Sequence, residues 1–468
     1  MEKKLIELNI ESLAFEGGGF VRLDGIPIFV RNAIPGDKIL ANIVRQKKKF
    51  INAEIEQILL ASKSRITPPC KYFGECGGCT LQNMVYPEQT FWKRQFVIDS
   101  LTHIAKLGDI EVLPTITSPL EYHYRNKMEF SFSASRWLML SEINTDEKII
   151  DKDFALGLHS PKNYMKVLNI DDCLIAPLGT QKILELVRSS ALQNNLQAFN
   201  SKTHSGFLKN LVVRYSSFED KLLLILITNT PKSDDEKNYA EYLSEKLFSE
   251  IPNLKGFILA TNSKVSNVAI GEIEKIYGEK DLIEEILGLK YRISPFSFFQ
   301  TNSFQLNQFI SSIIEIAEPK NDEIIYDFYC GTGSITLPMS KKCKSIYGFE
   351  SYAHSIEDAK NNAEINNIEN ANFQVLDLSS KNLINEFTSF PKPDTIILDP
   401  PRSGLHKNTV EGLIQISPEK IIYVSCNPAT LARDLEKFKE FYSVEVVQPI
   451  DMFPQTYHIE TIIKLNKK

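Results

Sequence analysis

The C-terminal part of the chain alternates short hydrophobic runs with helix-like segments, and this alternation restricts the fold more than any other feature. The pattern predicts helices over 303–317 and 353–366 and strands over 323–328, 345–349, 372–376, 395–398 and 420–424. Strands and helices that alternate in this way build a mainly parallel sheet with helices on both faces. We therefore predict a doubly wound, Rossmann-like α/β domain over residues 296–468.

Two regions of different pattern precede this domain. Residues 1–62 show short alternating strands separated by Gly17-Gly18-Gly19 and Pro35-Gly36-Asp37, which predicts a small OB-like β-barrel. Residues 63–295 are expected to form a mixed α+β domain that opens with a cysteine-rich loop and a helix near 88–105, which can pack on the C-terminal domain. Further elements are predicted there, namely strands over 127–133, 211–215, 222–228 and 256–261 and a helix over 234–248.

Composition limits the function classes. No apolar run reaches the roughly 18 residues that a bilayer requires, and the first residues are charged, so we expect a cytoplasmic protein with no membrane contact. A net charge of −6 argues against non-specific coating of nucleic acid. The basic run Arg45–Lys49 beside Phe50 still fits contact with RNA, although such runs are also common in solvated hairpins. Nothing in the sequence indicates an obligate protein partner.

A glycine turn marks a cofactor site in the C-terminal domain. The segment Asp327–Gly333 follows the first predicted strand, with Gly331 and Gly333 in the turn. Glu350 closes the second strand, where a carboxylate can accept hydrogen bonds from ribose hydroxyls, and Asp377 closes the third, where an adenine ring would lie. The turn lacks the third glycine of the dinucleotide fingerprint, which disfavours NAD.

Three further side chains predict a methyl transfer to a pyrimidine. Asp399 ends the fourth strand in Asp-Pro-Pro-Arg, Cys426 follows the fifth, and Glu460 lies 34 residues later. Carbon 5 of uracil attacks a sulfonium methyl group only after a nucleophile has added at C6, and its proton must afterwards be removed by a base. Cys426 fits the nucleophile and Glu460 the base, beside S-adenosylmethionine. We expect the site to lower the pKa of the thiol or to supply a base for it.

Other interpretations of these residues remain open. The Asp-Pro-Pro segment is typical of amino-group methyltransferases, but these carry an aromatic residue where this chain has Arg402. Cys426 could also be a small buried hydrophobic residue. The seven cysteines include a cluster near residue 75, and from the residues alone a zinc site and an iron–sulfur site fit it equally well.

Taken together, these motifs resemble the bacterial 23S rRNA (uracil-5-)-methyltransferases. The N-terminal barrel, with Ile34–Asp37, is similar to an RNA-binding TRAM domain, and Phe298–Asn302 matches the family segment whose glutamine, here Gln300, contacts S-adenosylmethionine. By the same resemblance, Tyr329 and Glu350 belong to the cofactor site, Asp399 lies between cofactor and uracil, Cys426 is the nucleophile and Glu460 the base. The resemblance also implies that a 4Fe-4S cluster is held by four residues, Cys70, Cys76, Cys79 and Cys173.

The resemblance implies that the chain forms 5-methyluridine at a specific position of 23S ribosomal RNA. The target base would have to be flipped out of its stack, because a paired base cannot present C6 to a thiol. One alternative is the T-loop uridine of transfer RNA, although that branch typically lacks the barrel and the cysteine cluster. Another is a non-catalytic iron–sulfur protein that binds RNA.

Overall fold

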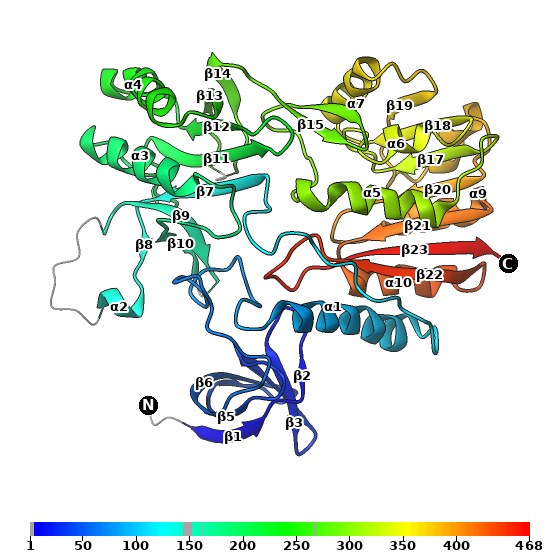
Figure 1. Ribbon diagram of the computed structural model, residues 1–468, viewed down its shortest axis with the longest axis horizontal. Helices are drawn as coiled ribbons and strands as arrows, with labels where there is room; N and C mark the ends of the chain where they lie inside the picture. Colours follow the sequence, from blue (N-terminus) through cyan, green and yellow to red (C-terminus); the bar gives the residue numbers. More distant parts are fainter. Residues whose placement is uncertain (1–3, 144–151, 162, 266–267) are drawn as a thin grey trace.

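A computed structural model of the chain describes residues 4–143, 152–161, 163–265 and 268–468. Its strands form three large sheets and one separate hairpin (Figure 1). Each large sheet is built from one continuous part of the sequence, so the chain completes one sheet before it begins the next. Across these residues, every helix is too short or too polar to cross a bilayer.

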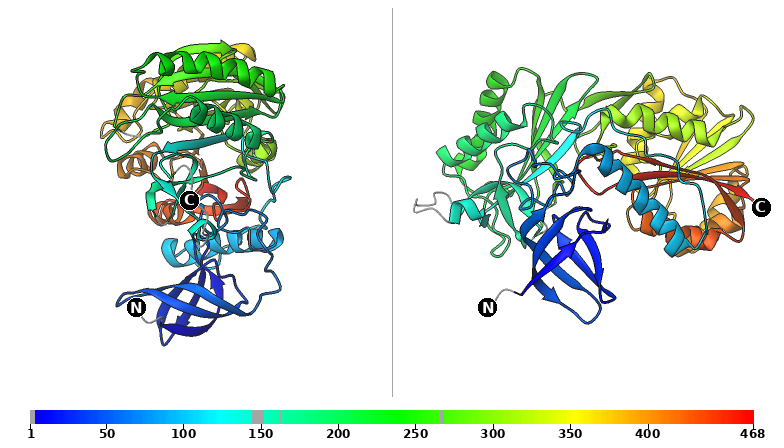
Figure 2. Two further views of the ribbon diagram at one scale, coloured as in Figure 1. Left: turned by 90° about the vertical axis from the view of Figure 1, so that its left-hand side faces the viewer. Right: turned by 60° about the horizontal axis from the view of Figure 1, so that its bottom comes forward.

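The first sheet has six strands in the order β1-β5-β6-β4-β3-β2. It curls around a small core that includes Leu8, Ile28, Val30 and Ile39, and it lies at one end of the molecule (Figure 2). Buried and half-buried side chains alternate along the first half of β5, as expected for a strand with one face toward the core. The strands are β1 (Leu5–Asn9), β2 (Ser12–Leu13), β3 (Gly19–Leu23), β4 (Ile26–Arg31), β5 (Lys38–Gln46) and β6 (Ile51–Leu60).

The second sheet has eight strands in the order β14-β13-β12-β11-β7-β9-β10-β8. Helices α3 (Thr180–Gln193) and α4 (Asp234–Glu250) share an apolar core with its central strands (Figure 1). Ser233 caps α4 by accepting a hydrogen bond from the Glu236 amide at 3.2 Å. The strands are β7 (Lys127–Ser133), β8 (Arg136–Trp137), β9 (Ala155–Ser160), β10 (Asn163–Asn169), β11 (Leu208–Ser216), β12 (Lys221–Thr228), β13 (Leu254–Thr261) and β14 (Glu272–Gly278), with a short helix α2 (Leu140–Ile143) after β8.

The third sheet confirms the predicted doubly wound α/β fold. Its seven strands run in the order β19-β18-β17-β20-β21-β23-β22, and the first five are parallel. The strands are β17 (Ile324–Phe328), β18 (Ser345–Glu350), β19 (Ala371–Val375), β20 (Thr395–Leu398), β21 (Lys420–Ser425), β22 (Tyr442–Ile450) and β23 (Glu460–Lys467). A hairpin of β15 (Leu282–Ile286) and β16 (Leu289–Ile293) leads into this sheet from the second one.

Both faces of the third sheet are buried, and consecutive strand residues point to opposite faces. Ile325 belongs to the core under α5 and α7, whereas Tyr326 belongs to the core under α9 and α10. Helices α5 (Ser303–Ala317), α6 (Thr336–Ser340) and α7 (Ala353–Ile365) are on the first side. The other side carries α8 (Leu383–Glu386), η2 (Phe387–Ser389), α9 (Lys407–Ile416) and α10 (Pro428–Phe438).

Helix α1 (Tyr86–Ser100) lies far from the third sheet in sequence but against it in space. With the π-helical turn η1 (Leu101–Ala105) it buries Val97, Leu101 and Ala105 among residues of α9, α10 and the strands (Figure 1). On the same helix, Lys93 forms an ion pair with Asp451 at 2.7 Å, and both side chains are inaccessible to solvent. This helix therefore fixes the loop between β22 and β23.

The two C-terminal strands are the main difference from the predicted pattern, which ended at residue 424. β23 inserts antiparallel between β21 and β22 and pairs with both. As a consequence, Glu460 is the first residue of a buried strand, opposite Ile450 of β22, rather than part of a loop.

Candidate active site

The glycine turn follows β17 and leaves open space above it. Gly331 and Gly333 have φ angles of +53° and +86°, which favour glycine. A Cβ atom on Gly331 would meet nothing within 4 Å, whereas one on Gly333 would meet Leu337 and Phe373 at 3.3 Å. Gly331 therefore leaves room for a ligand to approach the backbone, and Gly333 allows the turn to pack closely on the sheet.

A cavity of about 580 Å³ lies beside this turn, at the carboxyl ends of the parallel strands. Tyr329, Asp377, Pro401 and residues 403–407 line it, so it is shaped by the loops after β17, β19 and β20. Glu350 is the last residue of β18, and its Oε1 accepts hydrogen bonds from the amides of Ser351 and Tyr352 at 2.7 and 3.1 Å. Ligands of open α/β sheets bind at this edge.

Asp377 differs in detail from the prediction. Strand β19 ends at Val375, so Asp377 lies two residues beyond the strand and is exposed. Its Oδ1 accepts hydrogen bonds from the hydroxyl and the amide of Ser379 at 2.6 and 2.9 Å, and these bonds hold the pKa of the carboxyl below its usual value. The residue still lines the cavity, as an ionised turn former.

Gln300 and Asp399 meet although they lie 99 residues apart. The Gln300 side-chain amide donates to Asp399 Oδ2 at 3.4 Å, and the Gln300 carbonyl accepts from the Asn126 side chain at 2.7 Å. Asn302 then caps α5, accepting from the Gln305 amide at 3.1 Å. The predicted cofactor glutamine is thus fixed by the central domain on one side and faces the strand-end aspartate on the other.

Cys426 and Glu460 come together with Asp399. Cys426 follows β21 immediately and precedes the Asn427 cap of α10, while Glu460 begins the neighbouring strand β23. Burial, and then the carboxylates of Glu460 and Asp399, raise the pKa of the Cys426 thiol to about 12, and the Arg402 guanidinium acts in the opposite direction. Of the two expected alternatives, a lowered thiol pKa or a base close to the thiol, the described side chains favour the second. Carboxylates surround the thiol, so a base is close to it.

Buried carboxyl groups give this site a preference for a positive charge. Burial raises the pKa of Asp327 to about 7, and burial also raises the pKa values of Asp399 and Glu460. Glu460 Oε2 and Asp327 Oδ1 are buried and accept no hydrogen bond from the described residues. A cation bound among these groups would relieve their mutual repulsion and would favour their ionised forms.

Sequence reasoning assigned no role to two residues beside this site, Arg402 and His458. Arg402 lies within contact of His458, with 3.3 Å between a guanidinium nitrogen and Nε2, and burial lowers the pKa of His458 to about 4. A neutral imidazole can accept this hydrogen bond. The position of Arg402 beside the two strand-end prolines was a visible signal, but no spacing rule indicated its contact with His458.

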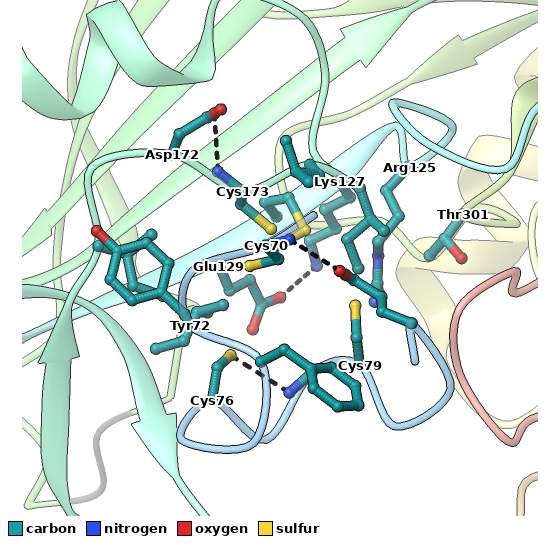
Figure 3. Close-up of a pocket in the computed structure, with 18 of the residues that line it drawn as sticks. Cys70, Tyr72, Cys76, Cys79, Arg125, Lys127, Glu129, Asp172, Cys173 and Thr301 are labelled. Atoms are coloured by element: carbon teal, nitrogen blue, oxygen red, sulfur yellow. Dashed lines mark hydrogen bonds and ion pairs between the residues drawn. The ribbon is translucent and has the colours of Figure 1, made fainter. Parts of the chain in front are cut away.

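The four cysteines predicted to hold a cluster line one pocket of about 360 Å³. Their sulfur atoms turn toward a shared space, with Arg125 and Lys127 at its wall (Figure 3). Cys173 comes from the segment after β10, and the other three from the loop before α1. Within the described residues, no group of three or more His, Cys, Asp or Glu side chains has the geometry to hold a metal ion.

One wall of this cysteine pocket also belongs to the site around Asp399. Phe298, Phe299 and Thr301 line the pocket, whereas the side chain of Gln300, between them, contacts Asp399. The segment 298–302 therefore separates the two sites, and its side chains serve both.

The strand order, the glycine turn and the acidic strand ends define a class I S-adenosylmethionine-dependent methyltransferase. Comparisons with known proteins narrow the class. The family model of tRNA (uracil-5-)-methyltransferases matches residues 236–468. A protein of Chlorobaculum tepidum named an uncharacterised RNA methyltransferase is 37% identical over 98% of this chain and 95% of its own length. Another of that name, from Caldanaerobacter subterraneus, is 37% identical over 99% of both chains.

A solved structure also matches nearly the whole chain. The tRNA (uracil-54, C5)-methyltransferase of Pyrococcus abyssi, in complex with S-adenosyl-L-homocysteine, superimposes with a TM-score of 0.75 at 27% identity. The match covers 98% of this chain and 100% of that one. The chain belongs to the RNA uracil-C5 methyltransferase family and is an S-adenosylmethionine-dependent enzyme that acts on RNA.

The buried carboxyls predict a pH-dependent affinity for the cofactor. Because burial raises the pKa values of Asp327 and Asp399 to about 7, these two carboxyls take up protons as the pH falls from about 8 to 6 and lose their attraction for the sulfonium charge. We expect the affinity for S-adenosylmethionine to weaken by up to about tenfold per pH unit for each proton that binding must displace. Isothermal titration calorimetry checks this slope. S-adenosyl-L-homocysteine, which lacks the sulfonium charge, is the matched ligand and should show a shallower slope; equal slopes would contradict the electrostatic role.

Proposed function

We propose that this enzyme methylates C5 of a uridine through a covalent bond between Cys426 and C6. The observation that carries the proposal is the meeting of Cys426, Asp399 and Glu460 at the carboxyl ends of β20 and β21 and the start of β23. A thiol and two carboxylates supply the nucleophile and the bases that this substitution requires. The cofactor, when bound, supplies an electrophilic methyl group to C5.

The proton transfers in this reaction require different roles for the carboxylates of Asp399 and Glu460. Cys426 is protonated at neutral pH in this environment, so its proton must pass to a base as the sulfur–C6 bond forms. Electrons of the C5–C6 double bond move to the O4 enolate, which makes C5 nucleophilic. Glu460 has to stay ionised for the later step, and we therefore assign the thiol proton to Asp399.

Product formation then requires the C5 proton to leave. Glu460 takes that proton, the C5–H electron pair restores the C5–C6 double bond, and the sulfur–C6 bond breaks. The departing thiolate recovers its proton from Asp399, and Glu460 releases its proton to solvent. The sequence of steps returns both residues to their starting states.

The cofactor contacts follow from the same resemblance and from the cavity beside the glycine turn. We assign Gln300, Tyr329, Glu350 and Asp377 to cofactor binding, together with the backbone at Gly331 and Gly333. The cavity lined by Tyr329 and Asp377 supports an adenine-binding role, and Glu350 at the end of β18 supports a ribose-binding role.

We further propose that residues 1–62 form a TRAM-like RNA-binding barrel, that residues 63–295 form a central domain and that residues 296–468 form the catalytic domain. Aromatic and basic side chains on the first sheet and its β5–β6 loop support the RNA contact; Phe29 is exposed, and Phe20 and Phe50 are half-buried. Phe20, Phe29 and Phe50 lie in a row, with ring centroids 5.4 and 6.2 Å apart, and Lys47 stands 5.2 Å from the Phe50 ring. Such rings stack on unpaired bases.

Loss of the Phe29 ring in Phe29→Ser should weaken RNA binding without changing cofactor affinity, and unchanged RNA binding would refute this role.

We propose that the four cysteines hold a 4Fe-4S cluster rather than zinc, as the resemblance to the family implies. All four cysteines line one pocket, which supports a shared metal group, and four cysteine thiolates are the usual ligands of a 4Fe-4S cluster. Arg125 and Lys127 at the wall would offset the negative charge of the cluster.

Metal analysis tests the cluster. Protein purified without oxygen should contain about four irons and four acid-labile sulfides per chain, because four thiolates of one pocket are available as ligands. Cys79→Ser should lose most of this iron, whereas Cys343→Ser, at a cysteine in the core of the third sheet, should keep it. One zinc per chain without sulfide would contradict the assignment.

The RNA substrate that we propose first is 23S ribosomal RNA, on the resemblance of the barrel and cysteine motifs to that branch. The match to the Pyrococcus abyssi transfer-RNA enzyme covers 98% of this chain, so the barrel and the cysteine segment do not separate the two substrates. Uridine in the transfer-RNA T-loop is therefore a second candidate. Mass mapping of 5-methyluridine in both RNAs, from cells with and without the gene, distinguishes them: loss from ribosomal RNA supports the first, and loss from transfer RNA alone refutes it.

A further inference from the structure

The position of Glu460 depends on the loop that precedes it. Its Oε2 is buried and has no hydrogen-bond donor among the described residues, so that oxygen has no partner to hold it in place. The residue itself stands at the start of β23, directly after the loop 451–459 that joins β22 to β23. Glu460 is the terminal residue of β23 and pairs with Ile450 of β22 only, so a shift of the loop at this end would move the carboxylate relative to Cys426.

Gln455 is the centre of that loop. It is a non-glycine residue with a φ of +68°, a conformation that costs free energy and persists only where the surroundings enforce it. Its carbonyl accepts hydrogen bonds from the Thr80 and Leu81 amides, both at 3.0 Å, one and two residues after Cys79. The side chain is 1% exposed, and its Nε2 donates to Glu121 at 3.3 Å. The loop is thus attached to the cysteine-rich segment through its backbone.

Gln89 of helix α1 completes the attachment. Its Oε1 accepts from the Gln455 amide at 3.1 Å, and its Nε2 donates to Gln455 Oε1 at 3.0 Å. The same Nε2 lies 2.9 Å from the Met84 carbonyl and 3.1 Å from the Leu81 carbonyl. Gln89 is itself 1% exposed, so solvent cannot replace these bonds. One glutamine side chain therefore joins the helix, the cysteine-rich segment and the loop that carries Glu460.

We propose that Gln455 and Gln89 are positioning residues for the proton abstraction by Glu460. The inference rests on the proposed function, because it takes Glu460 as the base that removes the C5 proton. Neither glutamine is assigned a contact with RNA or cofactor. Their task is to hold the loop 451–459 so that Glu460 faces the nucleotide bound to Cys426.

This role predicts a specific failure when the glutamine pair is broken. Attack of Cys426 on C6 and methyl transfer do not use Glu460, so they should continue. Removal of the C5 proton should slow, and with it the breakage of the sulfur–C6 bond. A methylated RNA should then remain covalently attached to Cys426, which a purely structural defect would not produce.

The test compares three variants of the full-length enzyme with unmodified uridine RNA and radiolabelled methyl donor. Gln89→Met removes the bonds to the loop with a side chain of similar length that also favours a helix. Gln95→Met is the matched control, since Gln95 lies on the same helix and its side chain donates to Asp99 at the surface, at 2.7 Å. Glu460→Gln sets the adduct level expected when the base is lost. Denaturing gels measure the labelled RNA–protein adduct, and product release measures turnover.

Gln89→Met is expected to lower turnover by about 10- to 100-fold, as misplacement of a catalytic group does, and to accumulate adduct as Glu460→Gln does. Gln95→Met should match the wild type, and cofactor affinity should stay within about twofold for all three. If Gln89→Met fails to fold, Gln455→Asn takes its place. Asparagine tolerates a positive φ, but its shorter side chain cannot reach Gln89 in the same way, so the variant should show the same fall in turnover and the same accumulation of adduct.

The outcomes separate the inference from the function on which it rests. If Glu460→Gln forms no adduct, the assignment of Glu460 as the base is wrong. If Glu460→Gln forms adduct but the glutamine variants turn over normally, or lose adduct and product together, the positioning role is wrong.

Discussion

Cys426→Ala is expected to abolish methylation, with a loss of more than about 10⁴-fold, because removal of a covalent nucleophile eliminates the pathway rather than slowing one step of it. Cofactor affinity should stay within about twofold, since Cys426 is not among the residues that line the cavity beside the glycine turn. The measurement is transfer of labelled methyl groups to RNA, with cofactor binding followed by calorimetry.

A second readout identifies the bond that is lost. RNA that carries 5-fluorouridine should trap the wild-type enzyme. A base cannot remove the fluorine that replaces the C5 proton, so the sulfur–C6 bond persists. Cys426→Ala should form no such adduct. Cys343→Ala is the matched control, since Cys343 lies in the core beside β18 and should leave both readouts unchanged. An adduct formed by Cys426→Ala would show that another residue is the nucleophile.

Loss of the buried ion pair between Lys93 and Asp451 is expected to have the largest effect on stability. Both side chains are fully buried and 2.7 Å apart, and Lys93 also donates to the Phe453 carbonyl at 3.0 Å. Lys93→Met would leave Asp451 charged and unpaired, at a cost of about 3–5 kcal/mol in the free energy of unfolding. Differential scanning calorimetry should record a lower melting temperature for the transition that unfolds the third sheet.

A double substitution tests whether the loss of stability in Lys93→Met comes from the unpaired charge of Asp451 or from lost side-chain packing. Lys93→Met/Asp451→Asn removes both charges of this pair, and the asparagine oxygen can still accept a hydrogen bond from the Phe453 amide, which in the native protein bonds to Asp451 Oδ1 at 2.9 Å. Most of the lost stability should return. Lys106→Met is the control, because Lys106 is 69% exposed in its ion pair with Glu436 and such pairs contribute at most about 1 kcal/mol. A double variant no more stable than Lys93→Met would contradict the argument.

Much of the C-terminal sheet could be predicted because its strands are short, apolar and separated by well-marked helices. Strand β20 and helix α5 agree with the predicted bounds, and the start of α5 could be predicted because Asn302 is a typical helix cap. The strand-end residues Glu350, Asp399 and Cys426 could be placed at one edge for a simple geometric reason. All parallel strands of a sheet end on the same side.

Other features required the three-dimensional structure. Nothing in the spacing of the sequence brings Cys173 to the pocket of Cys70, Cys76 and Cys79; only the resemblance to a family implied it. The pairing of β22 with β23 was hidden because the chain runs nine residues between them without a tight turn signal. Gln89 and Gln455 are 366 residues apart, and a glutamine in a polar helix is normally interpreted as a solvent-facing residue.

The packing of α1 and η1 against the third sheet has a consequence for the order in which the protein matures. As the chain leaves the ribosome, Val97, Leu101 and Ala105 emerge more than 200 residues before the strands and helices that will cover them. Until β20, β21 and α10 have been synthesised, this apolar stripe has no native partner and is open to chaperones or to aggregation. The helix therefore gains its native contacts only after most of the C-terminal sheet, including α10, has been synthesised.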